Sequence, residues 1–296
     1  MTAKPDAAPE LGRAHDCPES NCAGGLSQLP RVPMSDSLLA RPPGRIAVAG
    51  DWHGNIDWVS RVVTLVRDRA PEVDTIFQLG DFGYFPYRPG YQFLAEVDAV
   101  CASAGLKRVV VTPGNHEDWD ELDFQFEKYP GEPVRVSEVV WMLPRGFRFT
   151  LSGRTFLSFG GAASVDFEWR SPGLDWWVTE TPTAEQVEAA IAEGPADVLF
   201  THEAVSRATV EVERILRGNP LGFSPLALGY SAVSRRRVTE VWDAVHPTVL
   251  AHGHMHLRGE IEMGDGRRVY SLAQSGLRGN VGLLDPQTLA WEWLDE

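Results

Sequence analysis

The chain has 296 residues, 43% hydrophobic and 23% charged, enough apolar residues for one large globular domain or two small ones. This composition excludes a disordered or fibrous protein. Lysine and arginine number 27 against 41 aspartates and glutamates, a formal net charge of -14. A surface this acidic repels a phosphate backbone, which argues against avid nucleic-acid binding.

The sequence shows no sign of membrane insertion or secretion. No run reaches the roughly 18 apolar residues that a spanning helix needs, and the N-terminus lacks the basic-then-apolar pattern of a signal peptide. Three cysteines, Cys17, Cys22 and Cys101, do not form a disulfide framework. We therefore expect a cytoplasmic protein that does not contact membranes, and nothing in the sequence indicates an oligomeric state.

Residues 1–44 are predicted to be a disordered leader. They contain seven of the 21 prolines and show neither a helical nor an alternating apolar period. An alternative is a small metal-binding knuckle formed by Cys17, Cys22 and His15, but no second cysteine pair follows at the spacing of a zinc finger. The leader carries four basic and five acidic residues, so the domain at residues 45–296 keeps a net charge of 23 minus 36, or -13.

From Arg45 onward, short apolar runs alternate with helical patterns, which is typical of crossover units on a sheet. Five runs rich in β-branched residues are predicted as buried strands, at residues 46–49, 75–79, 108–111, 197–200 and 248–250. Four amphipathic patterns predict helices at residues 56–69, 91–104, 183–192 and 231–245, the third opening with a capping box of Thr183 and Gln186.

Three further segments read as hairpins. They are residues 147–159, turning at Ser152 and Gly153, residues 258–271, and residues 281–293. Crossover units combined with hairpins predict an α/β (α+β) fold, a four-layer α-β-β-α sandwich of two mixed sheets flanked by helices.

Polar residues follow all five predicted strands. They are Asp51 and His53, then Asp81, then Asn115 and His116, then His202, and finally His254 and His256. In open α/β sheets, ligands bind at this carboxyl edge. A single one of these residues is most often a helix cap or a turn residue. Five of the eight histidines, however, lie at strand ends close to acidic residues. This clustering indicates one shared metal site.

Carboxylates and imidazoles without thiolates suit hard to borderline divalent ions, here manganese, iron, zinc, nickel or cobalt. Asp81 has two carboxylate oxygens and can bridge two ions about 3.5–4 Å apart. The neighbouring glycines permit the tight turns that a crowded site needs, at Gly50, Gly80, Gly114 and Gly253.

These motifs, in this order, resemble those of the calcineurin-like metallophosphoesterase family: Asp51-x-His53, Gly80-Asp81, Gly114-Asn115-His116-Glu117, His202 and Gly253-His254-x-His256. The resemblance runs from Arg45 to about the C-terminus. It implies the metallophosphoesterase fold and hydrolysis of a phosphate ester by a hydroxide that bridges two divalent metal ions.

The resemblance also implies a role for each residue. Asp51, His53 and His256 would hold one ion, Asn115, His202 and His254 the other, and Asp81 would bridge them. His116 would be the catalytic general acid that protonates the leaving group.

The chain departs from the protein Ser/Thr phosphatase branch of that family. Tyr84 and Phe85 stand where that branch has an acid and a phosphate-clamping arginine, and loss of this bidentate clamp disfavours a protein phosphatase. We therefore expect a small phosphodiester or nucleotide-like substrate. The alternatives are a phosphomonoester of a small molecule or nucleic-acid end, and a noncatalytic metal-binding scaffold for protein partners, against which the full ligand set argues.

An aromatic-rich segment, residues 158–177, is a candidate for shaping the substrate pocket. We hypothesise that Arg170 contacts phosphate and that Trp176 or Trp177 stacks on a ring of the substrate. Tyr84, directly after the predicted bridging aspartate, is a candidate for the lip of the pocket. For the tryptophans and Tyr84 the alternative is a packing role.

Overall fold

The computed structural model describes residues 44–84 and 89–294. The chain divides into the units Met1–Pro30 and Arg31–Glu296, and all elements below belong to the second. The predicted leader, with its possible Cys17 and Cys22 knuckle, lies outside the described residues except for Gly44, and Phe85 lies outside them too. The statements on these residues stay predictions.

The first sheet has seven strands in the order β13-β12-β1-β2-β3-β5-β4. Their bounds are β1 Ile46–Ala49, β2 Thr75–Gln78, β3 Arg108–Val111, β4 Val134–Arg135, β5 Val140–Met142, β12 Val281–Leu284 and β13 Trp291–Trp293. Strands β1, β2, β3 and β5 run parallel, whereas β4, β12 and β13 are antiparallel to their neighbours. The carboxyl ends of β1, β2 and β3 therefore meet at one edge.

The second sheet has six strands in the order β10-β11-β9-β8-β7-β6. Their bounds are β6 Phe147–Leu151, β7 Arg154–Phe159, β8 Val198–Thr201, β9 Val249–His252, β10 Gly259–Glu262 and β11 Arg268–Ser271. The four inner strands are parallel, and the edge strands β6 and β10 close the predicted hairpins. Both sheets are thus mixed, as predicted.

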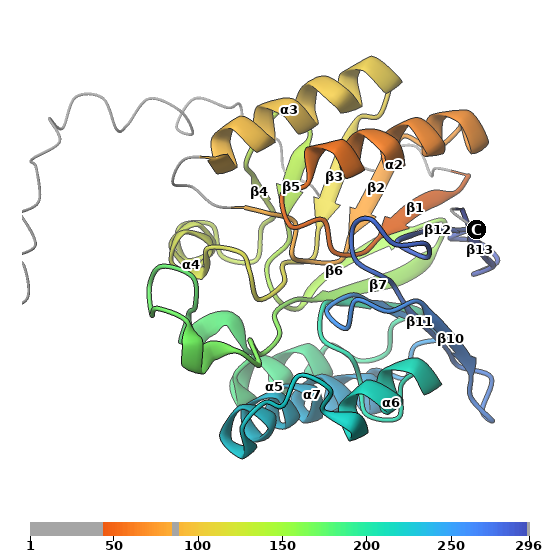
Figure 1. The fold of residues 1–296 in the computed structure, drawn as a ribbon. Helices are drawn as coiled ribbons and strands as arrows, with labels where there is room; N and C mark the ends of the chain where they lie inside the picture. The colour runs from red at the N-terminus through yellow and green to blue at the C-terminus, as the bar shows by residue number, and fades with distance from the viewer. Residues whose placement is uncertain (1–43, 85–88, 295–296) are drawn as a thin grey trace, which may run out of the picture. The chain divides into compact units, whose positions relative to one another are not determined.

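Helices cover the outer face of each sheet (Figure 1). Helices α2 (Ile56–Arg69) and α3 (Pro89–Ala104) lie on the first sheet, and α5 (Ala184–Ala192), α6 (Val210–Gly218) and α7 (Pro225–Val245) lie on the side of the second. Helix α4 (Trp119–Lys128) follows β3, and two 3-10 turns, η1 (Phe167–Trp169) and η2 (Val178–Glu180), follow β7.

Side-chain alternation along the strands divides the core into three apolar layers. In β1, Ile46 and Val48 pack between the two sheets, whereas Ala47 and Ala49 pack under the helices of the first sheet. A third cluster lies between the second sheet and helices α5 and α7. This period of two on a fully buried strand is what two packed sheets with helices outside require. The predicted four-layer sandwich is confirmed.

Several elements differ from their predicted extent. Helix α7 begins at Pro225, six residues before the predicted start, because Ser224 caps it and accepts a hydrogen bond from the Ala227 amide, with proline in the first turn. Helices α4 and α6 and the short strands β4 and β5 were not predicted.

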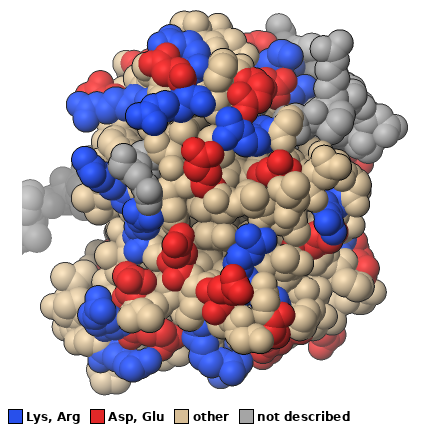
Figure 2. Space-filling view, turned by 90° about the vertical axis from the view of Figure 1, so that its right-hand side faces the viewer, with Lys and Arg blue, Asp and Glu red and all other residues tan. Residues whose placement is uncertain are grey.

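Acidic and basic side chains alternate over the face shown in Figure 2, so the acidic surplus does not gather in one patch on that face. Within residues 44–84 and 89–294, no helix combines the length and hydropathy needed to cross a membrane.

Candidate metal centre

The predicted ligands lie where β1, β2, β3, β8 and β9 end, and they form two groups. In the first, Asp51, His53, Asp81 and His256 place one ligand atom each within 4.8 Å of the others. The His256 Nε2 atom lies 3.1 Å from Asp51 Oδ2, and His53 Nε2 lies 3.4 Å from Asp81 Oδ2. This group joins residues from both sheets.

The second group consists of Asp81, His202 and His254, again within 4.8 Å of one another. The His202 Nε2 atom lies 3.2 Å from Asp81 Oδ1 and 3.1 Å from Asn115 Oδ1. Asp81 therefore belongs to both groups, with one oxygen facing each. This is the geometry that the predicted bridging role of Asp81 requires.

Backbone carbonyls and carboxylates orient these ligands. The His202 Nδ1 atom lies 2.6 Å from the Leu79 carbonyl, so Nδ1 donates to that carbonyl and Nε2 is the ring nitrogen that faces the site. The His254 amide donates to both Asp51 oxygens, at 3.0 and 3.1 Å, and the His116 amide donates to Asp81 Oδ1 at 2.9 Å. The first two contacts thus fix a ligand from one sheet against backbone from the other, and the third joins two loops of the first sheet.

Glu117 organises the two loops that carry Asp81 and Asn115. Its buried carboxylate accepts hydrogen bonds from four backbone amides, those of Asp81, Phe82, Gly83 and Gly114. Burial and the Asp81 carboxylate raise the pKa of Glu117, against the lowering effect of the Gly114 and Gly83 amides. Glu117 belongs to the Gly114-Asn115-His116-Glu117 motif, but the sequence alone did not predict a role for it.

The residues present fit two divalent cations. Asp81 Oδ2 is buried and has no hydrogen-bond donor among the described residues, which suits an oxygen that awaits a cation. Four ligands, His53, Asp81, His254 and His256, hold φ between 49° and 65°, a strained region for residues other than glycine. A Cβ on Gly114 would strike Asp81, so glycine is required for this close approach.

Electrostatics in the metal-free chain reflect this crowding. Burial would lower the pKa of His202, but the carboxylates of Asp81 and Asp51 raise it to about 10. Burial would raise the pKa of Asp81, yet His202 and His116 hold it well below its usual range. The centre is therefore built around an Asp81 carboxylate that is ionised at neutral pH and attracts positive charge.

His116 lies at the rim of this centre and is held by Arg170. The Nη1 and Nη2 atoms of Arg170 lie 2.9 and 3.2 Å from His116 Nδ1 and Nε2. Arg170 also donates from Nε and Nη2 to Asp166 at 2.7 and 2.8 Å, and from Nη1 to the Asp175 carbonyl at 2.9 Å. All three guanidinium nitrogens thus have acceptors within the chain. The hypothesis that Arg170 contacts phosphate stays a prediction. The contacts in the structure instead place Arg170 against His116.

Asn115 is held from the side opposite His202. Its Nδ2 atom donates to Ser164 Oγ at 3.0 Å, and Ser164 Oγ lies 2.7 Å from Glu180 Oε2. Both Ser164 and Glu180 are buried. Sequence analysis missed these two residues because neither follows a predicted strand in a ligand-like motif.

The aromatic candidates have different surroundings. Tyr84 is 1% exposed and Trp177 is 5% exposed, and both pack in the core between the first sheet and its helices rather than at a lip. Trp176 is half-buried, with its ring centroid 5.5 Å from that of Phe167, and its Nε1 donates to Glu180. Aromatic side chains beside a ligand loop suit packing as well as substrate contact, which is why sequence could not separate the two roles.

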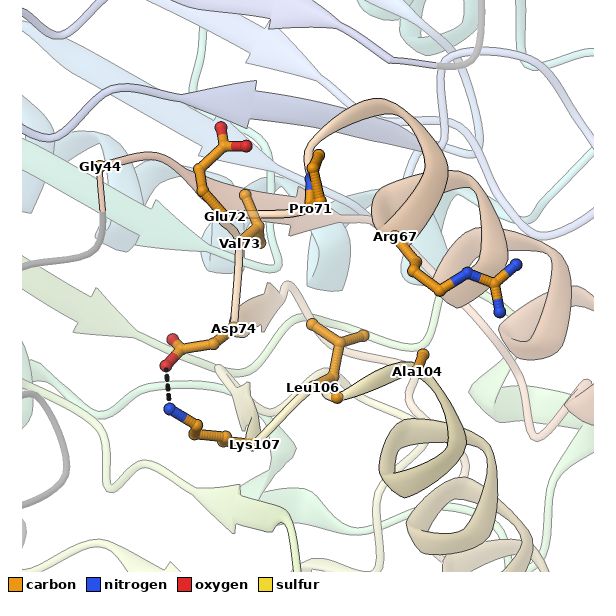
Figure 3. A pocket seen from close by; sticks show the side chains of 10 residues that line it. Gly44, Arg67, Pro71, Glu72, Val73, Asp74, Ala104, Leu106 and Lys107 are labelled. Carbon is orange, nitrogen blue, oxygen red and sulfur yellow. Dashed lines mark ion pairs between the residues drawn. The ribbon is translucent and has the colours of Figure 1, made fainter.

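A pocket lies at the opposite edge of the first sheet (Figure 3). Its lining residues include Gly44, Asp74 and Lys107, which precede β1, β2 and β3, whereas the predicted ligands follow these strands. Asp74 and Lys107 form an ion pair of 3.2 Å within it. This pocket is separate from the metal centre.

Comparisons with known proteins agree with this site. The family model described as calcineurin-like phosphoesterase matches residues 44–258, a range that contains every predicted ligand. No curated protein matches the chain. The solved structure of TT1561 of Thermus thermophilus is 15% identical and has a TM-score of 0.50, covering 84% of this chain and 96% of that one. A dimetal phosphatase from Danio rerio is 12% identical with a TM-score of 0.49, covering 82% and 92%. The similarity to TT1561 shows a shared fold.

Proposed function

The chain belongs to the calcineurin-like phosphoesterase family, hydrolases that act on phosphoric ester bonds, and we propose that its substrate is a small phosphodiester or nucleotide-like compound. The observation that carries phosphate-ester hydrolysis at this site is the position of Asp81 in both ligand groups, with His116 Nε2 only 3.8 Å from Asp81 Oδ2. Two cations held there would polarise the phosphoryl group and lower the pKa of a nearby water.

The ligand assignment follows the two groups. Asp51, His53 and His256 would hold one ion, Asn115, His202 and His254 would hold the other, and Asp81 would contribute to both. The proposed ions are divalent, with manganese as our first choice for experiment, because imidazole and carboxylate donors without thiolates accept it.

His116 is proposed as the general acid, with the transferred proton on its Nε2 atom. A neutral imidazole has one acceptor nitrogen. Arg170 Nη1 lies 2.9 Å from Nδ1 and Arg170 Nη2 lies 3.2 Å from Nε2, and Nε2 lies 3.8 Å from Asp81 Oδ2. We assign the acceptor role to Nδ1 and the proton to Nε2. From there, Nε2 can donate to the departing alkoxide.

The preference for a diester rests on how Arg170 uses its donors. A phosphomonoester dianion is best recognised by a free guanidinium fork. Arg170 directs its N–H groups to Asp166, Asp175 and His116, so it offers no such fork. A diester carries a single negative charge and needs no second clamp.

The test compares hydrolysis of bis(p-nitrophenyl) phosphate with that of p-nitrophenyl phosphate by metal-stripped protein refilled with Mn²⁺. We expect metal-dependent turnover that favours the diester. Asp81→Asn, which keeps the left-handed backbone accessible, should abolish it. His116→Asn should lower kcat only slightly for this activated diester and by about 10²-fold for a diester with a more basic leaving group, such as diphenyl phosphate.

His246→Asn is the matched control for the histidine change. His246 lies at the C-cap of α7, and its side chain is 62% exposed, so its loss should leave turnover unchanged. Turnover of the monoester alone would refute the diester preference, and turnover that survives Asp81→Asn would refute the assigned centre.

A further inference from the structure

We propose that Glu180 is a positioning residue that determines, through the Ser164 hydroxyl, which end of the Asn115 amide faces the metal centre. The inference rests on the metal centre of the proposed function, but not on the identity of the substrate. Glu180 belongs to η2, Ser164 to the loop after β7 and Asn115 to the loop after β3, so the three residues meet only in the folded chain.

The first step is that Glu180 acts as an acceptor at both oxygens. Its Oε1 atom accepts from the Ser164 amide at 2.6 Å and from Trp176 Nε1 at 3.1 Å, groups that can only donate. The Tyr230 hydroxyl lies 2.8 Å from the same oxygen. Because the Glu180 carboxylate is fully buried and surrounded by donors, its position is fixed and it acts only as an acceptor.

The second step is the direction of the hydrogen bonds. Because an ionised carboxylate cannot donate, Ser164 Oγ donates to Glu180 Oε2 and has a lone pair free for Asn115 Nδ2 at 3.0 Å. The amino end of Asn115 therefore faces Ser164. Its carbonyl oxygen faces His202 Nε2 at 3.1 Å, inside the second ligand group.

The third step is the chemistry of the amide. The oxygen of an asparagine side chain can bind a divalent cation, whereas its amino group has no free lone pair for one. A flipped Asn115 would lose a ligand without any change of shape. Glu180 prevents the flip by fixing the direction in which the Ser164 hydroxyl donates.

The decisive variant is Glu180→Gln, which keeps size and shape but reverses this direction. Its carbonyl oxygen is held at the Oε1 position by three donors, so its amino group takes the Oε2 position and donates to Ser164 Oγ. The serine hydroxyl then turns toward Asn115 and favours the flipped amide. We expect the Mn²⁺ affinity of one of the two sites to fall 10- to 100-fold, with the other site unchanged.

Mn²⁺ binding is measured by titration calorimetry on the full chain at pH 8.5, because burial raises the pKa of Glu180 to about 7 and the carboxylate must be ionised. Tyr230→Phe is the matched control. It removes one hydrogen bond to Oε1 but does not reverse the serine hydroxyl, so it should bind two ions as the wild type does.

Ser164→Ala completes a double-mutant cycle. It should weaken the same site, and adding Glu180→Gln to it should have no further effect, because Glu180 acts through the hydroxyl. If Glu180→Gln does not fold, Ser164→Ala alone carries the test, and unchanged binding of both ions by it would overturn the proposal.

Three results would overturn the inference: two wild-type affinities in Glu180→Gln, equal loss at both sites, or additive effects in the double variant. A wild-type chain that binds fewer than two Mn²⁺ ions would overturn it as well. Since hydrolysis is not measured, failure here is distinguishable from failure of the diester proposal.

Discussion

At the scale of single residues, the arginine beside His116 is the feature that most distinguishes this site. Burial lowers the pKa of His116, and the Arg170 guanidinium lowers it further against the opposing Asp81 carboxylate. Arg170 in turn is neutralised by its paired contacts with Asp166. A neutral imidazole beside a neutralised guanidinium does not clamp an anion.

One experiment distinguishes the two possible roles of Arg170, positioning of His116 and contact with phosphate. If Arg170 positions His116, Arg170→Lys should lower kcat about 10- to 100-fold and leave KM nearly unchanged, because a lysine cannot contact both Asp166 and His116 in the same plane. The loss should grow as the leaving group becomes more basic, since a better leaving group needs less protonation.

Steady-state kinetics on a series of aryl diesters measures this. Arg67→Lys is the control, since Arg67 lies on α2 and pairs with Asp68 on the surface. A rise in KM at constant kcat would instead support the phosphate contact suggested by the sequence.

The sequence predicted which side chains gather at the candidate metal centre, because each follows an apolar strand closely and one local pattern gives both position and chemistry. It could not predict Glu180, whose role depends on contacts with Ser164, Trp176 and Tyr230, 16, 4 and 50 residues away. Nor could it tell that Trp177 is buried, because burial of an aromatic residue in a loop depends on tertiary packing.

At the scale of elements, Arg145 fixes the segment that carries Glu180. It donates to the Gly160 carbonyl at 2.8 Å, to Gln186 Oε1 at 2.7 Å, and to the carbonyls of Thr179 and Glu180 at 3.2 and 3.1 Å. Its guanidinium lies 4.4 Å from the centre of the Trp119 ring. One side chain thus joins the loop after β7, η2, α4 and α5.

We expect Arg145→Met to lower the free energy of unfolding by about 3 kcal/mol, since it leaves several carbonyls without donors, and also to reduce turnover by displacing Glu180. Arg148→Met is a close counterpart, because Arg148 donates to the carbonyls of Ala190, Gly194 and Pro195 at the end of α5. It should destabilise the fold comparably but keep turnover. Urea unfolding and diester hydrolysis measure the two effects, and equal loss of turnover in both variants would contradict this role.

The elements that sequence analysis missed fall into two kinds. Helix α4 carried a readable signal, since Asp118 caps it by accepting from the Glu121 amide, an acid-x-x-Glu pattern typical of a helix start. Strands β4 and β5 have two and three residues, too few for an alternating pattern. They form by pairing with β3 and each other, which no local window contains.

At the scale of the whole molecule, the metal centre joins the two sheets. Asp51, His53, Asp81 and Asn115 come from the first sheet, and His202, His254 and His256 come from the second. Each ligand group contains residues of both. An ion in either group therefore connects the two halves of the sandwich across their shared carboxyl edge.

Removal of metal should consequently lower the thermal stability of the whole domain without unfolding it. The Asp81 carboxylate helps raise the pKa of His202 to about 10, so the metal-free chain keeps a protonated imidazolium beside Asp81 as a partial replacement for the ion.

A ligand present at 100 times its Kd stabilises by about 2.7 kcal/mol, and each kcal/mol shifts Tm by about 2–4 °C in a domain of this size. For two ions we expect Mn²⁺ to raise Tm by about 10 °C over protein treated with EDTA. Differential scanning calorimetry measures the shift, and Asp81→Asn should lose most of it because both groups share that residue. A rise of the same size in Asp81→Asn would mean that Mn²⁺ stabilises the domain from somewhere other than the edge where the two sheets meet.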